Sequence, residues 1–383
     1  MFLALRDLRF ATGRFALMGS VVALISLLLV MLSGLTAGLD GQNTAAIDRL
    51  GEQGVQRLAF GGAADQEPTA SFTQSEFTVA QRDAWAATDG VASVEPLGVS
   101  QGRAIGLEHP VDTDPQGRAD VSGEPTTGVA TTAFIGLTPG GSDAPAGVEP
   151  GQIVLSQDVA DSLHAQTGDA VAVSGFVYTV ADVVPTEYYS HSPVTWLALE
   201  DWNAISHTAD DAVLGTAGLV RFDADADVDA VAAAGDDAAG TVAETVKGSY
   251  AALPSYRSEN GSLMTMQGFL YGISALVVIA FLSIWTVQRT RDIAVLKALG
   301  GSNGWVLKDS LAQAAFVLVG GVAVGTGLAT VIGAFAGRAV PFELSWATTA
   351  VPAAGVLVLG MLAAVVAVYR VTRIDPLVAL GGN

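Results

Sequence analysis

Side chains able to perform metal or acid–base chemistry are few in this sequence and form no catalytic pattern. Of its 383 residues, 4 are histidines and none is a cysteine. No two histidines have the i, i+3 or i+4 spacing that places two metal ligands on one face of a helix. An alternating acidic run at 223–229 resembles the start of a calcium loop, but Val228 and Ala234 stand where an EF-hand needs glycine and glutamate. We therefore expect no catalytic residue and no metal site, and we interpret residues 223–234 as an acid-capped helix start.

The sequence also lacks the loop that cradles ATP phosphates. Its lysines are Lys247, Lys297 and Lys308, and none of them follows a glycine. A Walker A loop needs a Gly-Lys pair, because its glycines let the backbone wrap the phosphates while the lysine reaches them. We therefore predict that the chain is not an enzyme that hydrolyses ATP.

The composition is that of a membrane protein. Half of the residues are hydrophobic and only 15% are charged, against about 25% charged residues in soluble proteins. Four runs without Asp, Glu, Lys or Arg, at 15–39, 263–287, 311–336 and 346–369, each reach the roughly 20 residues needed to cross a bilayer. The first run exceeds the apolar region of about 7–15 residues in a signal peptide, so we favour a retained helix. We predict four transmembrane helices.

Charge differs sharply between the segments that flank these runs. Residues 1–14, 288–310 and 370–383 together carry 9 basic and 4 acidic residues, whereas residues 40–260 carry 8 basic and 33 acidic ones. Basic flanks of membrane helices stay on the cytoplasmic side. We therefore expect a multi-pass plasma-membrane protein with both termini in the cytoplasm and residues 40–260 outside. The net charge of -20 argues against a nucleic-acid partner, because phosphate binding needs a positive surface.

The segment at 40–260 has the pattern of a mixed α/β domain. We predict a helix at 77–88, entered through Ser75 or Thr78, and strands at 91–99 and 131–137 that end at glycine or proline. A strand at 153–155, a helix at 156–164 and β-rich runs at 170–173, 176–184 and 196–199 follow. The predicted fold class is a membrane protein of four transmembrane helices with one mixed α/β extracytoplasmic domain between helices 1 and 2.

The most specific segment follows the second apolar run. Residues 288–302 read Gln-Arg-Thr-Arg-Asp-Ile-Ala-Val-Leu-Lys-Ala-Leu-Gly-Gly-Ser. Ile293, Leu296 and Leu299 recur near helical spacing, which predicts an amphipathic stalk that the two glycines end. This segment resembles the signature after the second helix of MacB/FtsX-type ABC transporter permeases. The tail Arg-Ile-Asp-Pro-Leu-Val-Ala-Leu at 373–380, the run at 150–202 and the order of one helix, a large domain and three helices are similar to that family too.

The resemblance implies a homodimer bound to two copies of an ABC ATPase subunit. That subunit would bind ATP and Mg, and the chain itself is expected to hold no cofactor. In the family, the segment matching residues 292–305 docks into the ATPase, and closure of the ATPases moves the outer domains by mechanotransmission. The ATPase-coupling residues expected from the motif are Arg289, Arg291, Asp292, Lys297, Leu299, Gly300 and Ser302.

With the resemblance included, the expected organisation of the chain has eight segments. They are a cytoplasmic interfacial helix at 1–14, transmembrane helix 1 at 15–39, the extracytoplasmic domain at 40–260, transmembrane helix 2 with its stalk and coupling helix at 261–309, transmembrane helix 3 at 310–337, a short outer loop at 338–345, transmembrane helix 4 at 346–369 and a cytoplasmic tail at 370–383.

Within the family, a four-span permease with a compact outer domain most resembles the haem-exporting permeases of Gram-positive bacteria. This implies efflux of a hydrophobic or amphipathic compound, haem among them, from the outer leaflet of the lipid bilayer. Methionine and tyrosine are common haem ligands, and aromatic side chains pack against the macrocycle. The candidate substrate-binding residues are Met31, Tyr256, Met264, Met266, Phe269 and Tyr271.

Two other functions stay open. FtsX-like members of the family use the same motion to regulate a cell-wall hydrolase outside the cell, and MacB-like members export antibiotics or peptides. A pull-down that captured a hydrolase through residues 40–260 would favour the first of these.

The apolar runs contain three Gly-x-x-x-Gly motifs, at 34–38, 321–325 and 333–337. Small residues at this spacing let two helix backbones approach closely, so the motifs predict tight helix packing.

Overall fold

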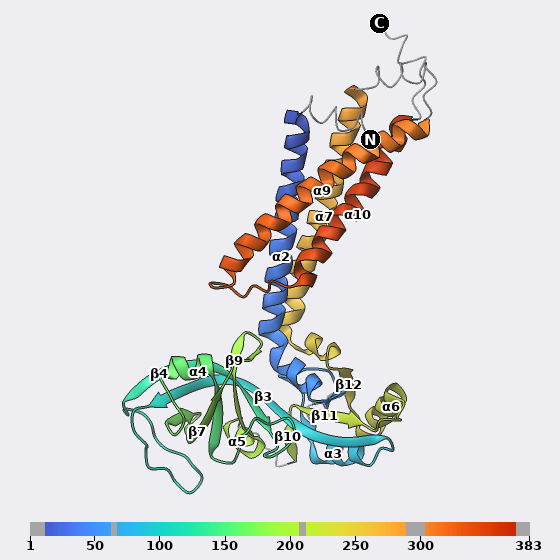
Figure 1. Ribbon diagram of the computed structural model, residues 1–383. Coiled ribbons are helices and arrows are strands. Elements are labelled where there is room, and N and C mark those ends of the chain that lie inside the picture. The colour runs from blue at the N-terminus through green and yellow to red at the C-terminus, as the bar shows by residue number, and fades with distance from the viewer. Residues whose placement is uncertain (1–11, 63–66, 207–211, 289–302, 373–383) are drawn as a thin grey trace, which may run out of the picture. The chain divides into compact units, whose positions relative to one another are not determined.

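The computed structural model describes residues 12–62, 67–206, 212–288 and 303–372 (Figure 1). The chain divides into two compact units, which we call the transmembrane unit (residues 1–39 and 260–383) and the α/β unit (residues 40–259). The coupling segment at 289–302, most of the predicted interfacial helix and most of the predicted tail lie outside the described residues.

Four long helices make up the described part of the transmembrane unit, and each contains a stretch long and apolar enough to cross a membrane (Figure 1). They are α2 (Thr12–Glu52), α7 (Pro254–Gln288), α9 (Asn303–Ala336) and α10 (Trp346–Thr372). The prediction of four transmembrane helices is confirmed. α2 continues past its predicted end because Ala46, Ile47 and Leu50 are buried in the core of the α/β unit.

The transmembrane unit is held together by side chains that the four helices turn toward one another. Val22 and Leu29 of α2, Val278 of α7, Leu318 of α9 and Ala364 of α10 are buried in one cluster. Lipid tails are as apolar as these side chains, so van der Waals packing rather than the hydrophobic effect must hold the helices together. Close approach of the backbones therefore decides which helices touch.

The Gly-x-x-x-Gly motifs serve two different contacts. The motif at 321–325 lies against α2, where a Cβ atom at Gly325 would stand 2.2 Å from the carbonyl oxygen of Ala23. The motif at 34–38 receives a loop instead, because a Cβ at Gly34 would stand 2.3 Å from the ring of Phe342. The same ring covers Gly333. The prediction of helix packing is therefore correct for the motif at 321–325 and wrong for the motif at 34–38, where the α9–α10 loop occupies the space.

The α/β unit is built on a ten-stranded sheet in the order β12-β1-β11-β3-β4-β9-β5-β7-β6, with β8 paired to β9 and β3 also paired to β6. The β3–β6 pairing closes strands β3, β4, β9, β5, β7 and β6 into a ring. The strands are β1 (Arg57–Phe60), β3 (Val91–Leu107), β4 (Thr126–Leu137), β5 (Gln152–Ser156), β6 (Ala170–Val173), β7 (Phe176–Val184), β8 (Tyr188–Tyr189), β9 (Ser192–Ala198), β11 (Ala217–Phe222) and β12 (Val242–Thr245), with β2 (Phe77–Thr78) and β10 (Val213–Gly215) in a small second sheet.

Short helices cover this sheet. They are α3 (Val79–Ala86), α4 (Gln157–Leu163), α5 (Leu199–Ile205), α6 (Val228–Ala239) and the 3-10 helix η1 (Gly248–Ala252). All strands of the ring contribute to a buried cluster with α4 and α5, including Phe134 of β4 and Leu155 of β5. The indole ring of Trp202, on α5, lies over Gly98 and Gly136, where a Cβ would stand 2.2 Å and 2.4 Å from its side chain.

Several elements of the α/β unit differ from the sequence predictions. β4 begins at Thr126 and β9 at Ser192, each several residues before its predicted start. β3 is 17 residues long and does not end near Val99 as predicted, because Gly98 makes room for Trp202 and does not break the strand. The predicted helix at 77–88 begins only at Val79, because Phe77 and Thr78 pair with β10. The Thr78 hydroxyl then accepts a hydrogen bond from the Gln81 backbone N–H and caps the helix.

A buried ion pair ties the loop after β4 to the sheet. Arg221 of β11 donates a hydrogen bond to Asp143, and the two side chains are 16% and 2% exposed. Arg57 makes the same type of pair with Asp229, whose side chain is 89% exposed. Removal of the acid takes the carboxylate away from the arginine, and water replaces that carboxylate less readily where the acid is buried.

We therefore expect Asp143→Ala to lower the unfolding free energy of the α/β unit by about 3 kcal/mol. Asp229→Ala is the matched control, and its effect should stay below about 1 kcal/mol, because Asp229 is 89% exposed and water can take its place beside the Arg57 guanidinium. Urea unfolding of the full chain in detergent, followed by the fluorescence of Trp85, Trp196 and Trp202, measures both effects. Equal losses in the two variants would contradict this account.

A second buried network surrounds Asp236 of α6. The indole N–H of Trp85 donates to the Thr241 hydroxyl at 2.9 Å, and that hydroxyl donates to Asp236 at 2.7 Å. The backbone N–H of Ala243 donates to the other carboxylate oxygen at 2.9 Å. Burial raises the pKa of Asp236 above its ordinary value of 3.8, although the hydrogen bonds from Thr241 and Ala243 oppose this shift.

This raised pKa predicts a pH-dependent contribution to stability. The native state holds the proton more tightly than the unfolded state, so the contribution of Asp236 is fully present below pH 3.8 and is lost as the pH rises through the native pKa. Asp236→Asn cannot ionise. Its unfolding free energy minus that of the wild type should therefore become more positive between about pH 4 and about pH 7. Asp237→Asn makes the same change of net charge on the next residue and is the control. If the unfolding free energy of Asp236→Asn minus that of the wild type fell as the pH rose, the raised pKa of Asp236 would be refuted.

Candidate functional site

The N-terminal half of α7 presents three of the candidate substrate-binding side chains away from the rest of its unit. Met264 is 66% exposed, Met266 49% and Phe269 69%. Met266 and Phe269 are three residues apart and share a face of the helix, whereas Met264 lies two residues before Met266 and points to another side. The surface is apolar and polarisable, which suits a flat hydrophobic ligand.

The other three candidates do not join them. Tyr271 packs on α10, where a Cβ at Gly355 would stand 2.8 Å from its ring. Tyr256 belongs to the α/β unit and packs edge-on against Tyr250 with ring centroids 5.4 Å apart. Met31 lies half-buried on α2. Of the six predicted residues, the structure therefore brings only Met266 and Phe269 together on one exposed face of α7, with Met264 exposed on another side of the same helix.

A row of uncovered glycines lies on α7 beside these side chains. A Cβ atom at Gly261, Gly268 or Gly272 would meet no described atom within 4 Å. Gly268 and Gly272 form a fourth Gly-x-x-x-Gly motif within the apolar runs. Its spacing is visible in the sequence, but the motif was not among the three predicted. In contrast to Gly325 of α9, which α2 covers, these glycines are exposed.

A hydrogen bond between side chains joins α7 to α2 within the transmembrane unit. The Gln267 amide donates to the Thr36 hydroxyl at 3.2 Å, and the same hydroxyl donates to the Leu32 carbonyl at 2.8 Å. Thr36 stands between the glycines at 34 and 38 on α2. The Gln267 and Thr36 side chains can separate by rotation about their side-chain bonds, without movement of α7 or α2.

In the α/β unit, the last part of α2 and the first turn of α7 meet in a polar cluster. Asn43 is 1% exposed, donates to Glu259 at 3.2 Å and accepts from Ser255 at 2.9 Å. His191 contacts the same Glu259 oxygen at 2.9 Å, and the hydroxyls of Ser190 and Ser255 are 2.9 Å apart. His191 is thus a structural residue of the turn between β8 and β9, a role that its sequence spacing did not indicate.

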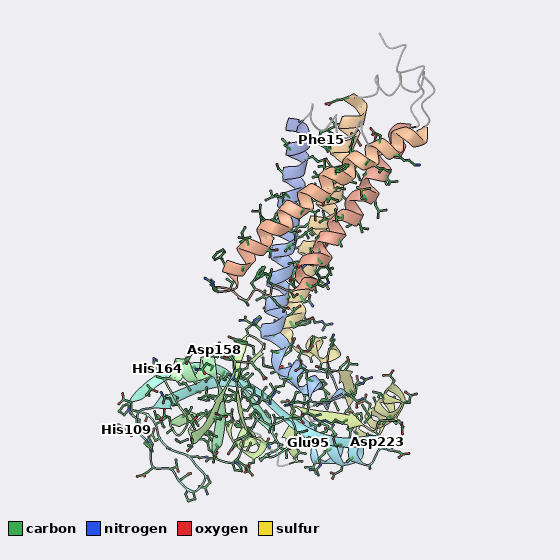
Figure 2. All side chains as sticks on the ribbon, viewed as in Figure 1. Phe15, Glu95, His109, Asp158, His164 and Asp223 are labelled. Atoms are coloured by element: carbon green, nitrogen blue, oxygen red, sulfur yellow. The ribbon has the colours of Figure 1, made fainter. Side chains whose placement is uncertain are left out.

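The described histidines outside this cluster do not form a site with one another. Figure 2 shows His109 beyond the end of β3 and His164 at the end of α4, on different elements. Among the described residues, no group of three His, Asp or Glu side chains is placed to hold a metal ion. The predicted ATPase-coupling residues, at 289, 291, 292, 297, 299, 300 and 302, lie outside the described residues.

The sequence is similar to those of known permeases. Residues 264–376 match the family described as FtsX-like permease C-terminal. Over 387 aligned residues, the chain is 22% identical to a protein of Staphylococcus epidermidis named as a candidate hemin transport system permease, HrtB, with 100% of both chains covered. The protein of the same name in Staphylococcus haemolyticus is 29% identical over 130 residues, which are 34% of this chain and 37% of that protein.

Among solved structures, the extracellular domain of the noncanonic ABC-type transporter YknZ from Gram-positive bacteria aligns with a TM-score of 0.32 at 13% identity. The alignment covers 50% of this chain and 98% of that domain. Residues 264–376 are therefore an FtsX-like permease C-terminal domain, and the chain is similar over its full length to a permease of an ABC-type transport system.

Proposed function

We propose that the chain is the permease subunit of an efflux transporter that expels a hydrophobic or amphipathic compound, with haem as the first candidate, from the outer leaflet. The observation that carries this proposal is the exposed apolar surface of α7, with Met266 and Phe269 on one face and Met264 on another. The full-length similarity to a hemin transport permease supports it. In the proposed orientation, both termini are cytoplasmic and residues 40–260 are outside, as the charges of the flanking segments favour.

ATP hydrolysis takes place in a separate ABC ATPase subunit, two copies of which bind a dimer of this chain. The absence of a Gly-Lys pair supports this division of labour. Residues 292–305 dock into the ATPase, and closure of the ATPases moves α2 and α7, through which the chain passes from one unit to the other. ATP and Mg belong to the ATPase, and haem is a substrate rather than a resident cofactor.

Haem suits the α7 face by its chemistry. A methionine thioether is a neutral ligand for haem iron, and an aromatic ring packs against the macrocycle. The Met266 thioether and the Phe269 ring, one turn apart on the same face of α7, offer both interactions at an exposed surface, and Met264 adds a second thioether on another side of the helix.

We expect haemin added to the detergent-purified chain to shift the Soret band, with saturation near one haem per dimer. Met264→Leu/Met266→Leu should weaken binding about tenfold or more, since each factor of ten is about 1.4 kcal/mol of ligation energy. The matched control is Met18→Leu/Met361→Leu, which changes two methionines that pack inside the helix cluster and should bind as the wild type does.

A shift no larger than that of empty detergent would overturn haem as the substrate. The permease assignment would stand, and antibiotics, peptides or a cell-wall hydrolase partner captured through residues 40–260 would be tested next. Equal binding by the two double variants would remove the methionines of α7 from the site but keep haem as the substrate.

We propose that the second copy of the chain in the dimer packs against the uncovered glycines of α7. Because the chain has no natural cysteine, a single introduced thiol reports one contact. Gly268→Cys should give a disulfide-linked dimer on mild oxidation. Gly320→Cys on α9, where a Cβ also meets no described atom within 4 Å, is the matched control and should stay monomeric. Similar cross-linking at both positions would argue against dimerisation through α7.

A further inference from the structure

The α9–α10 loop makes an unusually close contact with α2. Phe342 fills the space over Gly34, and a Cβ at Gly38 would stand 2.3 Å from the carbonyl oxygen of Pro341. The backbone N–H of Glu343 donates to the Gly34 carbonyl at 3.0 Å. A Cβ at Gly333 of α9 would also stand 2.5 Å from the Phe342 ring. Phe342 is therefore wedged between α2 and α9.

Both ends of this loop are fixed. At its start, the backbone N–H of Val340 donates to the Ala336 carbonyl at 3.0 Å. At its end, the backbone N–H of Ser345 donates to the Thr348 hydroxyl at 2.9 Å, and the Thr348 N–H donates back to the Ser345 hydroxyl at 3.2 Å. This reciprocal pair caps α10. A loop braced in this way moves with α9 and α10.

The contact of α2 with α7 is of another kind. At the level of Gly34 and Gly38, it includes the side-chain hydrogen bond from Gln267 to Thr36. A rotamer change breaks this bond, whereas withdrawal of α2 from the loop must break a backbone hydrogen bond and empty the Phe342 site. The two sides of α2 thus differ in how readily they can open.

We propose that Pro341 and Phe342 form a strap that fixes the outer half of α2 to α9 and α10 and confines lateral opening of the transmembrane unit to the side of α2 that faces α7. This inference rests on the proposed efflux function for its purpose, because the opening would lie beside the exposed methionines of α7 and would admit a compound held there. Phe342 is then a positioning residue, and it does not touch the substrate.

Amide hydrogen exchange on the full chain in detergent tests the strap without any substrate. Gly34→Ala should speed the exchange of the Glu343 amide about tenfold, because the new methyl group displaces the Phe342 ring. Gly320→Ala on α9 is the matched control, since a Cβ meets no described atom there, and it should leave that amide unchanged. Exchange in the α/β unit shows that each variant is folded.

A double-mutant cycle then isolates the contact itself. Phe342→Ala should also speed exchange at Glu343, and Gly34→Ala/Phe342→Ala should be no faster than Phe342→Ala alone, because the collision has lost one partner. Additive effects, or unchanged exchange in Gly34→Ala, would overturn the strap.

The side of opening is tested by a matched pair of threonines. Thr36 and Thr330 each donate to a carbonyl four residues earlier at 2.8 Å, and Thr36 also accepts from Gln267. Thr36→Val should speed haemin association about threefold in stopped flow, whereas Thr330→Val should not. Equal rates would overturn opening on the α7 side. No haemin binding in any variant would overturn the proposed substrate instead, and the exchange results alone would then decide the strap.

Discussion

Backbone contact at glycine is the interaction on which the transmembrane unit depends. In lipid, a leucine gains little by leaving its surroundings for another leucine, so helices associate where their backbones can come close. α9 meets α2 at Gly325, opposite the Ala23 carbonyl, and the α9–α10 loop meets α2 at Gly34 and Gly38. α2 is therefore held along much of its apolar length by contacts that no residue with a side chain could make.

The α/β unit is organised by different forces. Its buried clusters are ordinary hydrophobic cores, and the ring of strands completes most of its hydrogen bonding internally. The ends of α2 and α7 belong to this unit. Ile47 and Leu50 are part of its apolar core, and Asn43, Ser255 and Glu259 share a polar cluster in which Asn43 is buried and the other two are partly exposed. In the proposed mechanism, a force carried along either helix enters the unit at this cluster.

The sequence predicted the features that depend on composition and period. Four apolar runs gave four helices, and the capping hydroxyl of Thr78 was among the predicted helix starts. It could not predict features that depend on distant partners. Gly98 resembles a strand end until Trp202 is placed over it, and Gly34 resembles a helix-packing residue until Phe342 is placed there. The predicted set of substrate-binding residues is split in the structure for the same reason. Tyr271 packs against Gly355, and Tyr256 packs against the core of the α/β unit, so both have partners far away in the chain. Met264, Met266 and Phe269 have no such partner among the described residues.

The wedge of Phe342 between Gly34 and Gly333 also limits how this permease can be recombined. Gly34 is about 300 residues from Gly333 in the chain, whereas Gly333 and Phe342 are only a few residues apart, yet the three residues pack in the same place. A chimera that brought in the α9–α10 loop of a relative with a smaller residue at 342 would leave a void beside α2. One that brought in α2 with a larger residue at 34 would force the loop out. The first helix and the last hairpin are thus a single unit of exchange, although the whole α/β domain lies between them in the chain.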